Sequence, residues 1–287
     1  MPPAPIRLGV HISIAGGVGK AVGRAKDLGC TAMQIFSRSP RMWKTAALSP
    51  REAAAFRRAA ADEGIDPVVI HTPYLLNLAA EDEGLHRRSI AALALDVERA
   101  EEMGARFVVT HMGSTGERGR QKGLEQTVRA LDAAAREDSP VTILLENSAG
   151  AGNMVGSSLE ELHEIMARVD KGERFGLCFD SCHGFAAGYD FRTAKTADLL
   201  ANALDRTVGR ERLALLHLND SFGELGSHLD RHAHIGQGNI GEAGFTWLLR
   251  HPAFQGVPMI LETPKEGPED DWRNLALVRR LITGEGG

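Results

Sequence analysis

Short apolar runs, several of them rich in β-branched residues, recur along the chain and alternate with longer segments of helical apolar spacing. Most runs begin roughly 35 to 45 residues after the one before, which is the length of a strand, a helix and their loops. Runs that are apolar throughout are typical of parallel strands buried on both faces. The pattern therefore predicts eight strands, at Leu8–Ile12, Ala32–Phe36, Pro67–His71, Phe107–His111, Val141–Glu146, Phe175–Asp180, Leu213–Leu218 and Pro258–Glu262.

The segments between these runs carry residues that start and stop helices. Ser49-Pro50-Arg51-Glu52 and Ser158-Leu159-Glu160-Glu161 fit the capping box, the first with proline at the first helical position. Gly29 and Gly104 stand where a helix would end in the left-handed conformation. Eight strand–helix units without an internal linker predict an α/β fold, a single (β/α)8 TIM barrel domain over residues 1–287. A doubly wound open sheet is the alternative, although no GxGxxG or Walker sequence supports a nucleotide-binding version of it.

Composition bears on the compartment more than on the fold. The chain has 287 residues and is 43% hydrophobic, enough to form a sizeable core. It has no apolar leader and no unbroken apolar stretch of membrane-spanning length, so we expect a cytoplasmic protein without a membrane partner. Its three cysteines are too few for a disulfide framework. Cys178 and Cys182 flank Asp180 without CxxC spacing, so we interpret them as packing thiols.

Ionisable side chains stand at the carboxyl end of seven of the eight predicted strands. They are His11, His71, His111, Glu146, Asp180, His217 and Glu262, with His183 three residues after Asp180. In a barrel these ends meet at one face, where barrel enzymes carry their active sites. Each residue alone has a plain structural explanation: Asp180 can cap the following turn, His183 can be a core histidine, and His11 can play a supporting part. Burying all of them together is costly unless cations compensate them, so the pattern predicts a metal site.

The loop after the seventh run adds residues of the same kind. Asp230 and His232 share a face of an extended segment, because side chains alternate there, and together they can hold one ion. His234 is also in phase and is either a ligand or a support for one. The net charge of −5 argues mildly against a polyanionic partner. Three divalent cations would bring that charge to about +1 and would place the positive charge at the site itself.

With these residues in view, the sequence resembles endonuclease IV, a family of xylose-isomerase-like barrels that repair abasic sites in DNA. The resemblance covers nearly the whole chain, from Gly9-Val10-His11-Ile12-Ser13 to Ile260-Leu261-Glu262-Thr263. Its most specific pieces are long motifs in matching order: His71-Thr72-Pro73-Tyr74-Leu75-Leu76-Asn77-Leu78, Leu145-Glu146-Asn147-Ser148-Ala149-Gly150, Gly176 to Asp190, His217-Leu218-Asn219-Asp220, and Asp230 to Gly238.

The resemblance implies metal-dependent hydrolysis of the phosphodiester 5′ to an abasic site, leaving a 3′-hydroxyl and a 5′-deoxyribose phosphate. It implies three zinc ions, with manganese acceptable at some positions. The implied ligand sets are His71, His111 and Glu146; Glu146, Asp180, His217 and Glu262; and His183, Asp230 and His232. Glu146 and Glu262 are the implied catalytic residues, the first bridging two ions and shaping the nucleophile, the second also accepting a proton from water. Whether a 3′-phosphodiesterase activity accompanies the main one stays open.

By the same resemblance, Arg41, Tyr74 and Leu75 would enter the duplex and fill the gap at the lesion. Without it, Arg41 is an ordinary loop cation, and Tyr74 and Leu75 pack under the barrel rim. The implied partner is double-stranded DNA containing abasic sites, with phosphate contacts from further loop cations at Arg38, Lys44 and Arg231. No exposed apolar seam is evident, so we expect a monomer.

Three positions depart from the usual family pattern. Phe222 stands where lysine is usual, Gln237 where glutamate is common, and Ser181 in place of threonine. Loss of the lysine removes a phosphate contact or a local counter-charge. Two rival functions remain in view. One is a sugar isomerase or epimerase on the same barrel, with one or two divalent ions. The other is a non-catalytic protein that binds damaged DNA and holds structural zinc, which the lack of thiolate ligands disfavours.

Overall fold

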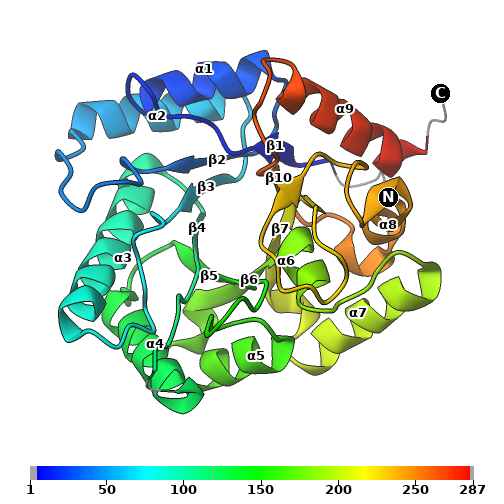
Figure 1. Ribbon diagram of the computed structural model, residues 1–287. Coiled ribbons are helices and arrows are strands. Elements are labelled where there is room, and N and C mark those ends of the chain that lie inside the picture. The colour runs from blue at the N-terminus through cyan, green and yellow to red at the C-terminus, as the bar shows by residue number, and fades with distance from the viewer. Residues whose placement is uncertain (1–4, 118, 285–287) are drawn as a thin grey trace.

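The computed structural model describes residues 5–117 and 119–284, so the ends of the predicted domain, residues 1–4 and 285–287, lie outside it. Within the described residues, eight parallel strands form a ring that helices surround (Figure 1). The order is β1-β10-β7-β6-β5-β4-β3-β2, and a parallel bridge between His11 and Gln34 joins β1 to β2. The predicted barrel is confirmed. Its strands are β1 (Leu8–Val10), β2 (Met33–Phe36), β3 (Val68–His71), β4 (Phe107–Thr110), β5 (Thr142–Glu146), β6 (Phe175–Asp180), β7 (Leu213–Leu218) and β10 (Met259–Leu261).

Helices connect successive strands and cover the outside of the ring. They are α1 (Gly19–Asp27), α2 (Pro50–Asp62), α3 (Glu83–Met103), α4 (Arg120–Ala134), α5 (Leu159–Arg168), α7 (Ala194–Arg206), α8 (Gly241–Arg250) and α9 (Asp270–Thr283). Short 3-10 turns, η1 (Gly172–Arg174), η2 (Arg210–Arg212) and η3 (Pro252–Phe254), lie between helices and the strands that follow. Every predicted run contains a strand, but His11, His111 and Glu262 lie one residue past the ends of β1, β4 and β10.

The two predicted capping boxes differ in the structure. At the start of α2 both reciprocal hydrogen bonds between Ser49 and Glu52 are present, so this box is confirmed. At the start of α5, Ser158 accepts from the backbone N–H of Glu161, but the Glu161 carboxylate binds elsewhere. It accepts from the backbone N–H of Gly156 and pairs with Arg120 of the preceding helix. The second box is therefore only half formed, because a cation competes for its glutamate.

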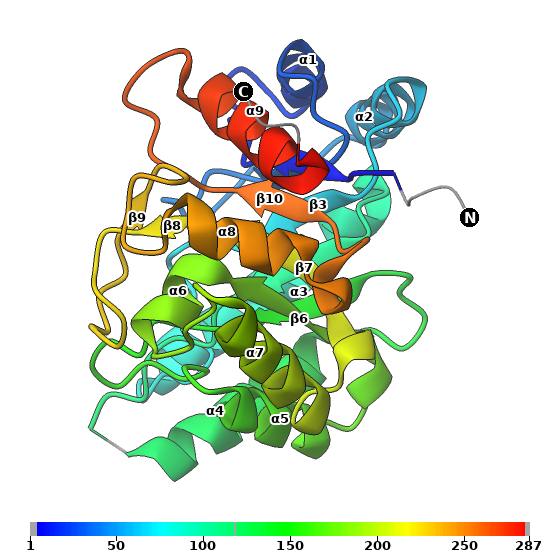
Figure 2. The same ribbon diagram turned by 90° about the vertical axis from the view of Figure 1, so that its right-hand side faces the viewer.

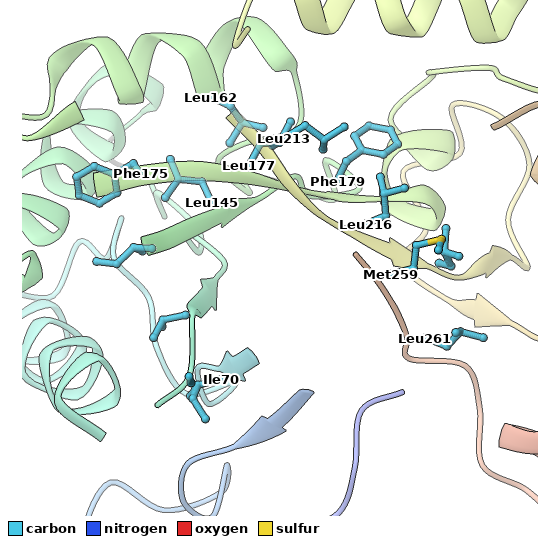
Figure 3. Packing of buried hydrophobic residues seen from close by; sticks show 14 of the residues in the cluster. Ile70, Leu145, Leu162, Phe175, Leu177, Phe179, Leu213, Leu216, Met259 and Leu261 are labelled. Atoms are coloured by element: carbon cyan, nitrogen blue, oxygen red, sulfur yellow. The ribbon is translucent and has the colours of Figure 1, made fainter. Parts of the chain in front are cut away.

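Alternation along each strand divides the apolar residues between two cores. Outward side chains pack against the helices, and Figure 3 shows Leu145, Leu177 and Leu213 of neighbouring strands in the same layer as Leu162 of α5. Inward side chains fill the ring with a smaller cluster, made of Ala32, Val69, Phe107, Val109, Leu144, Cys178, Leu215 and Ile260. Cys178 therefore packs inside the barrel, as predicted, and Cys30 and Cys182 are also buried free thiols.

Additional short elements cover the carboxyl end of the ring. Helix α6 (Ser181–Ala186) follows β6 directly, and β8 (Asp220–Ser221) pairs antiparallel with β9 (His232–Ala233). Figure 2 shows α6 and this β8–β9 ribbon together on the left side of the molecule. The loops predicted to carry site residues therefore gather at one mouth of the barrel. No helix in the described ranges is both long enough and apolar enough to cross a bilayer.

Gly9 lies where β1 approaches β2 closely. A Cβ atom at this position would lie 1.8 Å from the carbonyl oxygen of Ala32, a backbone atom that cannot move without distorting β2. Gly9→Ala should therefore lower the free energy of unfolding by at least about 2 kcal/mol. Gly23→Ala in α1 is the matched control: its Cβ meets nothing within 4 Å, so it should leave stability unchanged or raise it by up to about 1 kcal/mol. Urea unfolding measures both, and two equally stable variants would contradict the close approach.

Candidate metal centre

The side chains predicted to bind metals lie on the inner face of the barrel because of the two-residue period of its strands. His71 is two residues after Val69 on β3, and Glu146 is two residues after Leu144 on β5. Since Val69 and Leu144 belong to the inner core, the residues two positions further on also face inward. The same relation holds for His111, Asp180, His217 and Glu262, which follow Val109, Cys178, Leu215 and Ile260. A layer of ionisable groups therefore sits directly above the apolar interior.

Glu146 lies at the centre of this layer and has no exposed surface. Its Oε2 is 3.2 Å from Nε2 of His71 and 3.2 Å from Nε2 of His111. Its Oε1 is 2.9 Å from Nδ1 of His217 and 3.5 Å from Nδ1 of His183. One carboxylate oxygen thus faces Nε2 of His71 and His111, and the other faces Nδ1 of His217, which is the arrangement that a bridging ligand between two cations requires.

Two further groups of ligand atoms adjoin Glu146. His217 Nδ1 also lies 3.3 Å from Glu262 Oε2 and 4.0 Å from Asp180 Oδ2. At the mouth of the barrel, His183 Nε2 lies 3.1 Å from Asp230 Oδ1 and 3.4 Å from Nε2 of His232. Within each of the three predicted ligand sets, the candidate ligand atoms lie within 4.8 Å of one another, so the structure brings all nine residues together in the predicted grouping. Their role as ligands stays a prediction.

In three of the five cluster histidines, the outer nitrogen, Nδ1, donates a hydrogen bond to a backbone carbonyl oxygen, which can only accept. Because the proton must then sit on the outer nitrogen, the inner nitrogen of the neutral ring is left with its lone pair facing the cluster. The pairs are His71 Nδ1 with the Thr72 carbonyl at 2.7 Å, His183 Nδ1 with the Asn147 carbonyl at 3.0 Å, and His232 Nδ1 with the Glu262 carbonyl at 3.0 Å. Convergent imidazole lone pairs and carboxylates, without a thiolate ligand, fit a divalent cation such as zinc.

Two side-chain amides without a predicted role complete the support of the cluster. Gln34 on β2 donates to Glu262 Oε1 at 2.6 Å, and its Oε1 accepts from Nε2 of His217 at 2.8 Å. Asn219 donates to Asp180 Oδ2 at 2.7 Å and accepts from the backbone N–H of Glu262 at 2.8 Å. Gln34 is a fully buried polar residue inside an apolar run, and that contrast is the signal that could have identified it.

Burial and opposite charge shift the pKa values of these groups in opposite directions. Burial raises the pKa of Glu146 and Glu262, but neighbouring imidazoles outweigh it and hold both pKa values well below the ordinary one. Burial lowers the pKa of His183 and His217, yet the carboxylates around them raise both well above 6.5. Burial also raises the pKa of the nearby Cys178 to about 12, so that thiol stays neutral and supplies no charge to His217.

The remaining predicted residues have mixed outcomes. Asp180 does cap the following helix, with Oδ1 accepting from the N–H of His183 at 2.8 Å, and it is still a member of the cluster. His11 contacts Glu262 at 3.2 Å from the edge of the site, which fits a supporting part. His234 lies 3.0 Å from the side-chain amide of Asn274, outside the three clusters. A fourth group of close atoms includes the Cys182 thiol with Asp180 and His232.

The residues expected to touch DNA lie around a cleft of about 640 Å³ that opens onto the clusters. Tyr74 and Leu75 line this cleft, and Tyr74 is 74% exposed, so it does not pack under the rim. Arg41 is exposed on the loop after β2. These positions fit a role in DNA binding, which stays a prediction.

The expected phosphate contact by Arg38 is wrong. Arg38 is 3% exposed and forms a bidentate pair with Asp96 of α3, at 3.1 Å through each nitrogen. Ser37 Oγ donates to the same carboxylate at 2.5 Å, and Arg99 donates to the carbonyls of Ser37 and Ala46. Arg38 therefore anchors the loop that carries Arg41 instead of contacting a ligand. Sequence alone could not show this, because the ion-pair partner Asp96 lies 58 residues away.

Comparison with known proteins defines the class first. The family described as a xylose isomerase-like TIM barrel matches residues 22–280. A solved D-tagatose 3-epimerase-like protein shares this fold, with a TM-score of 0.75 over 97% of both chains and 21% sequence identity. That likeness shows the fold alone, because one barrel supports many reactions.

Closer relatives narrow the class to one family. A protein of Methanoculleus marisnigri named "Probable endonuclease 4" is 47% identical over 278 residues, which is 96% of this chain and 99% of the relative. The crystal structure of endonuclease IV from Thermus thermophilus matches with a TM-score of 0.86 and 44% identity, over 97% of this chain and 99% of that one. The chain belongs to the endonuclease IV family.

Metal-free protein should lose stability as the pH rises above 6.5. His183 and His217 have raised pKa values, so their ion pairs stabilise the fold below 6.5 and lose that contribution as the pH passes through the raised values. His11 and His111, whose pKa values burial lowers, act in the opposite direction but have smaller shifts. A bound cation replaces the protons, so zinc should stabilise the protein more as the pH rises. Thermal melts with chelator and with zinc test this, and parallel pH curves for the two forms would contradict it.

Proposed function

We propose that this protein is a metal-dependent DNA-repair endonuclease that hydrolyses the phosphodiester 5′ to abasic sites in duplex DNA, leaving a 3′-hydroxyl and a 5′-deoxyribose phosphate. The class of enzyme, a nuclease, follows from its family. The observation that carries the finer proposal is the three adjoining groups of His and carboxylate atoms around Glu146, at the floor of an open cleft. The cleft is also lined by Tyr74 and Leu75, which suits a substrate larger than a sugar.

The residues that would hold the cations are the nine of the three groups, with zinc as the proposed metal, three ions in number and manganese acceptable at some positions. Divalent cations held there would lower the pKa of a bound water and neutralise charge on the reacting phosphate. Glu146 holds two groups together through its separate oxygens. Gln34 and Asn219 fix the orientation of Glu262 and Asp180, so that little reorganisation is needed during the reaction.

The low pKa of Glu262 makes it a weaker proton acceptor than an ordinary glutamate, which favours its part as a ligand over its part as a base. His183, Asp230 and His232 lie at the cleft mouth. We propose that the cation they would hold stabilises the negative charge on the departing 3′ oxygen. Arg41, Tyr74 and Leu75 would fill the gap that the displaced sugar leaves. We further propose that the chain acts as a single barrel domain, as a monomer in the cytoplasm.

A sugar isomerase or epimerase is disfavoured by the same geometry. One or two ions would account for the inner groups, but not for the His183, Asp230 and His232 group at the mouth. A small polar substrate would also leave the exposed ring of Tyr74 without a partner. A passive binder with closed structural zinc is disfavoured because the clusters adjoin an open cleft.

Incision of a duplex with one tetrahydrofuran abasic analogue tests the proposed activity. The analogue lacks the aldehyde needed for β-elimination, so a cut 5′ to it must be hydrolytic. Zinc-loaded wild-type protein should cut there, and His183→Ala should lower the rate by at least about 100-fold because it removes a proposed ligand of the group at the cleft mouth. His163→Ala is the control, since His163 is exposed on α5. An intact strand with fully loaded protein would contradict the proposal.

Tyr74→Ala should weaken binding of the abasic duplex without changing zinc content. Loss of one aromatic ring that stacks in the duplex costs about 1–3 kcal/mol, or roughly five- to 150-fold in affinity. A 2-aminopurine base opposite the lesion reports insertion by its fluorescence, and this signal should fall in the variant. Trp247→Ala, an exposed ring on α8, should leave both readouts unchanged. If Tyr74→Ala binds the abasic duplex as tightly as wild type, Tyr74 does not contact the DNA.

A further inference from the structure

Phe222 is an exposed aromatic residue beside the metal centre that the proposed reaction does not use. It directly follows β8, and 57% of it is exposed. It lies outside the cleft, whose lining includes Asp230 and His232. Arg231 lies between Asp230 and His232 in the chain. Because both neighbours belong to the group at the cleft mouth, Arg231 is also held at the mouth.

Backbone hydrogen bonds hold Phe222 in place on both sides. Its N–H donates to the carbonyl of Arg231 at 3.0 Å, which extends the pairing of β8 with β9 by one step. Its carbonyl accepts from the side chain of Asn239 at 2.8 Å. The far end of the loop is also tied down, because the N–H of Gly226 donates to Phe185 and that of His228 to Ala186. The exposed ring is therefore carried by an ordered segment.

Arg231 lies over this ring. Its guanidinium carbon is 4.2 Å from the ring centroid of Phe222, within the range of a cation–π interaction. Arg231 is itself exposed, so the pair presents a flat surface and a positive charge to solvent together. A planar ring and a guanidinium are the two groups on which nucleobases stack in proteins that hold nucleic acid without reading its sequence.

We propose that the Phe222–Arg231 pair is a stacking platform for the base next to the abasic site, with Arg231 also contacting the phosphate of that nucleotide. The proposal rests on the proposed function, since it takes abasic DNA as the ligand. An abasic nucleotide leaves two flanking bases, on its 5′ and 3′ sides, each with one face unstacked. Arg41, Tyr74 and Leu75 would cover one of these faces, and the platform covers the other. The damaged sugar enters the cleft beside Asp230 and His232, and the flanking nucleotide meets the rim one residue away.

A cycle that removes the ring, the base or both tests this contact. Wild type and Phe222→Leu are compared on a duplex with one tetrahydrofuran site and on duplexes in which the 5′ or the 3′ neighbour is a second tetrahydrofuran. Single-turnover incision at increasing enzyme concentration gives a half-saturating concentration and a maximal rate. On the single-site duplex, Phe222→Leu should raise the half-saturating concentration at least about fivefold, with the maximal rate within about twofold of wild type.

Without the neighbouring base, Phe222→Leu should no longer affect the half-saturating concentration. On one of the two double-site duplexes, wild type and Phe222→Leu should agree within about twofold, because there is no base left to stack. Phe222→Trp should retain wild-type behaviour on the single-site duplex. Arg231→Gln should make the affinity for DNA less dependent on salt: the slope of log affinity against log salt concentration should fall by about one, the contribution of one phosphate contact. Trp247→Leu, at an exposed ring on α8, is the control for loss of a surface aromatic.

Three results would overturn the platform. Phe222→Leu could match wild type on the single-site duplex, or it could lose the same factor on all three duplexes, which shows no coupling to a base. It could also lower zinc content and maximal rate together, which would make Phe222 a structural part of the β8–β9 ribbon. If zinc-loaded wild type cuts none of the duplexes, the proposed function itself fails, and that outcome is distinct from these three.

Discussion

The burial of Glu146 is the constraint on which the site depends. A carboxylate without exposed surface lies within 3.5 Å of nitrogens of four histidines, drawn from β3, β7, α6 and the end of β4. Such a group is stable inside a protein only if positive charge surrounds it. In the metal-free chain protons on the imidazoles supply that charge, and divalent cations can replace them. The eight-stranded ring keeps these residues at fixed separations, so one buried carboxylate links the fold to the chemistry.

Periodicity in the sequence was sufficient to predict the barrel and the layer of polar residues. The eight apolar runs all became strands, and strand-end residues such as His71, Asp180 and Glu262 met because parallel strands finish at a common face. The same argument could not group them into sets, because it gives position around the ring but no distances. The grouping came from the family resemblance, and the structure places the residues in that grouping.

The supporting residues could not be predicted, for identifiable physical reasons. Gln34 binds His217 and Glu262 across the ring, contacts that depend on strand order and not on local pattern. From the sequence, Arg38 is an ordinary loop cation, yet it forms a buried ion pair with Asp96 of α3. The Ser158 box failed to close because Arg120, from another helix, pairs with Glu161. In each case a long-range polar partner decides the outcome, and a single sequence does not reveal such partners.

We expect the inward layer of imidazoles and carboxylates to bind cations on both sides of Glu146. Crystals of the zinc-loaded protein measured at the zinc absorption edge test it most directly, because anomalous scattering locates zinc independently of activity. We predict anomalous peaks within coordination distance of both Glu146 oxygens and a further peak among His183, Asp230 and His232. An absence of anomalous density next to Glu146 in fully loaded protein would contradict the account.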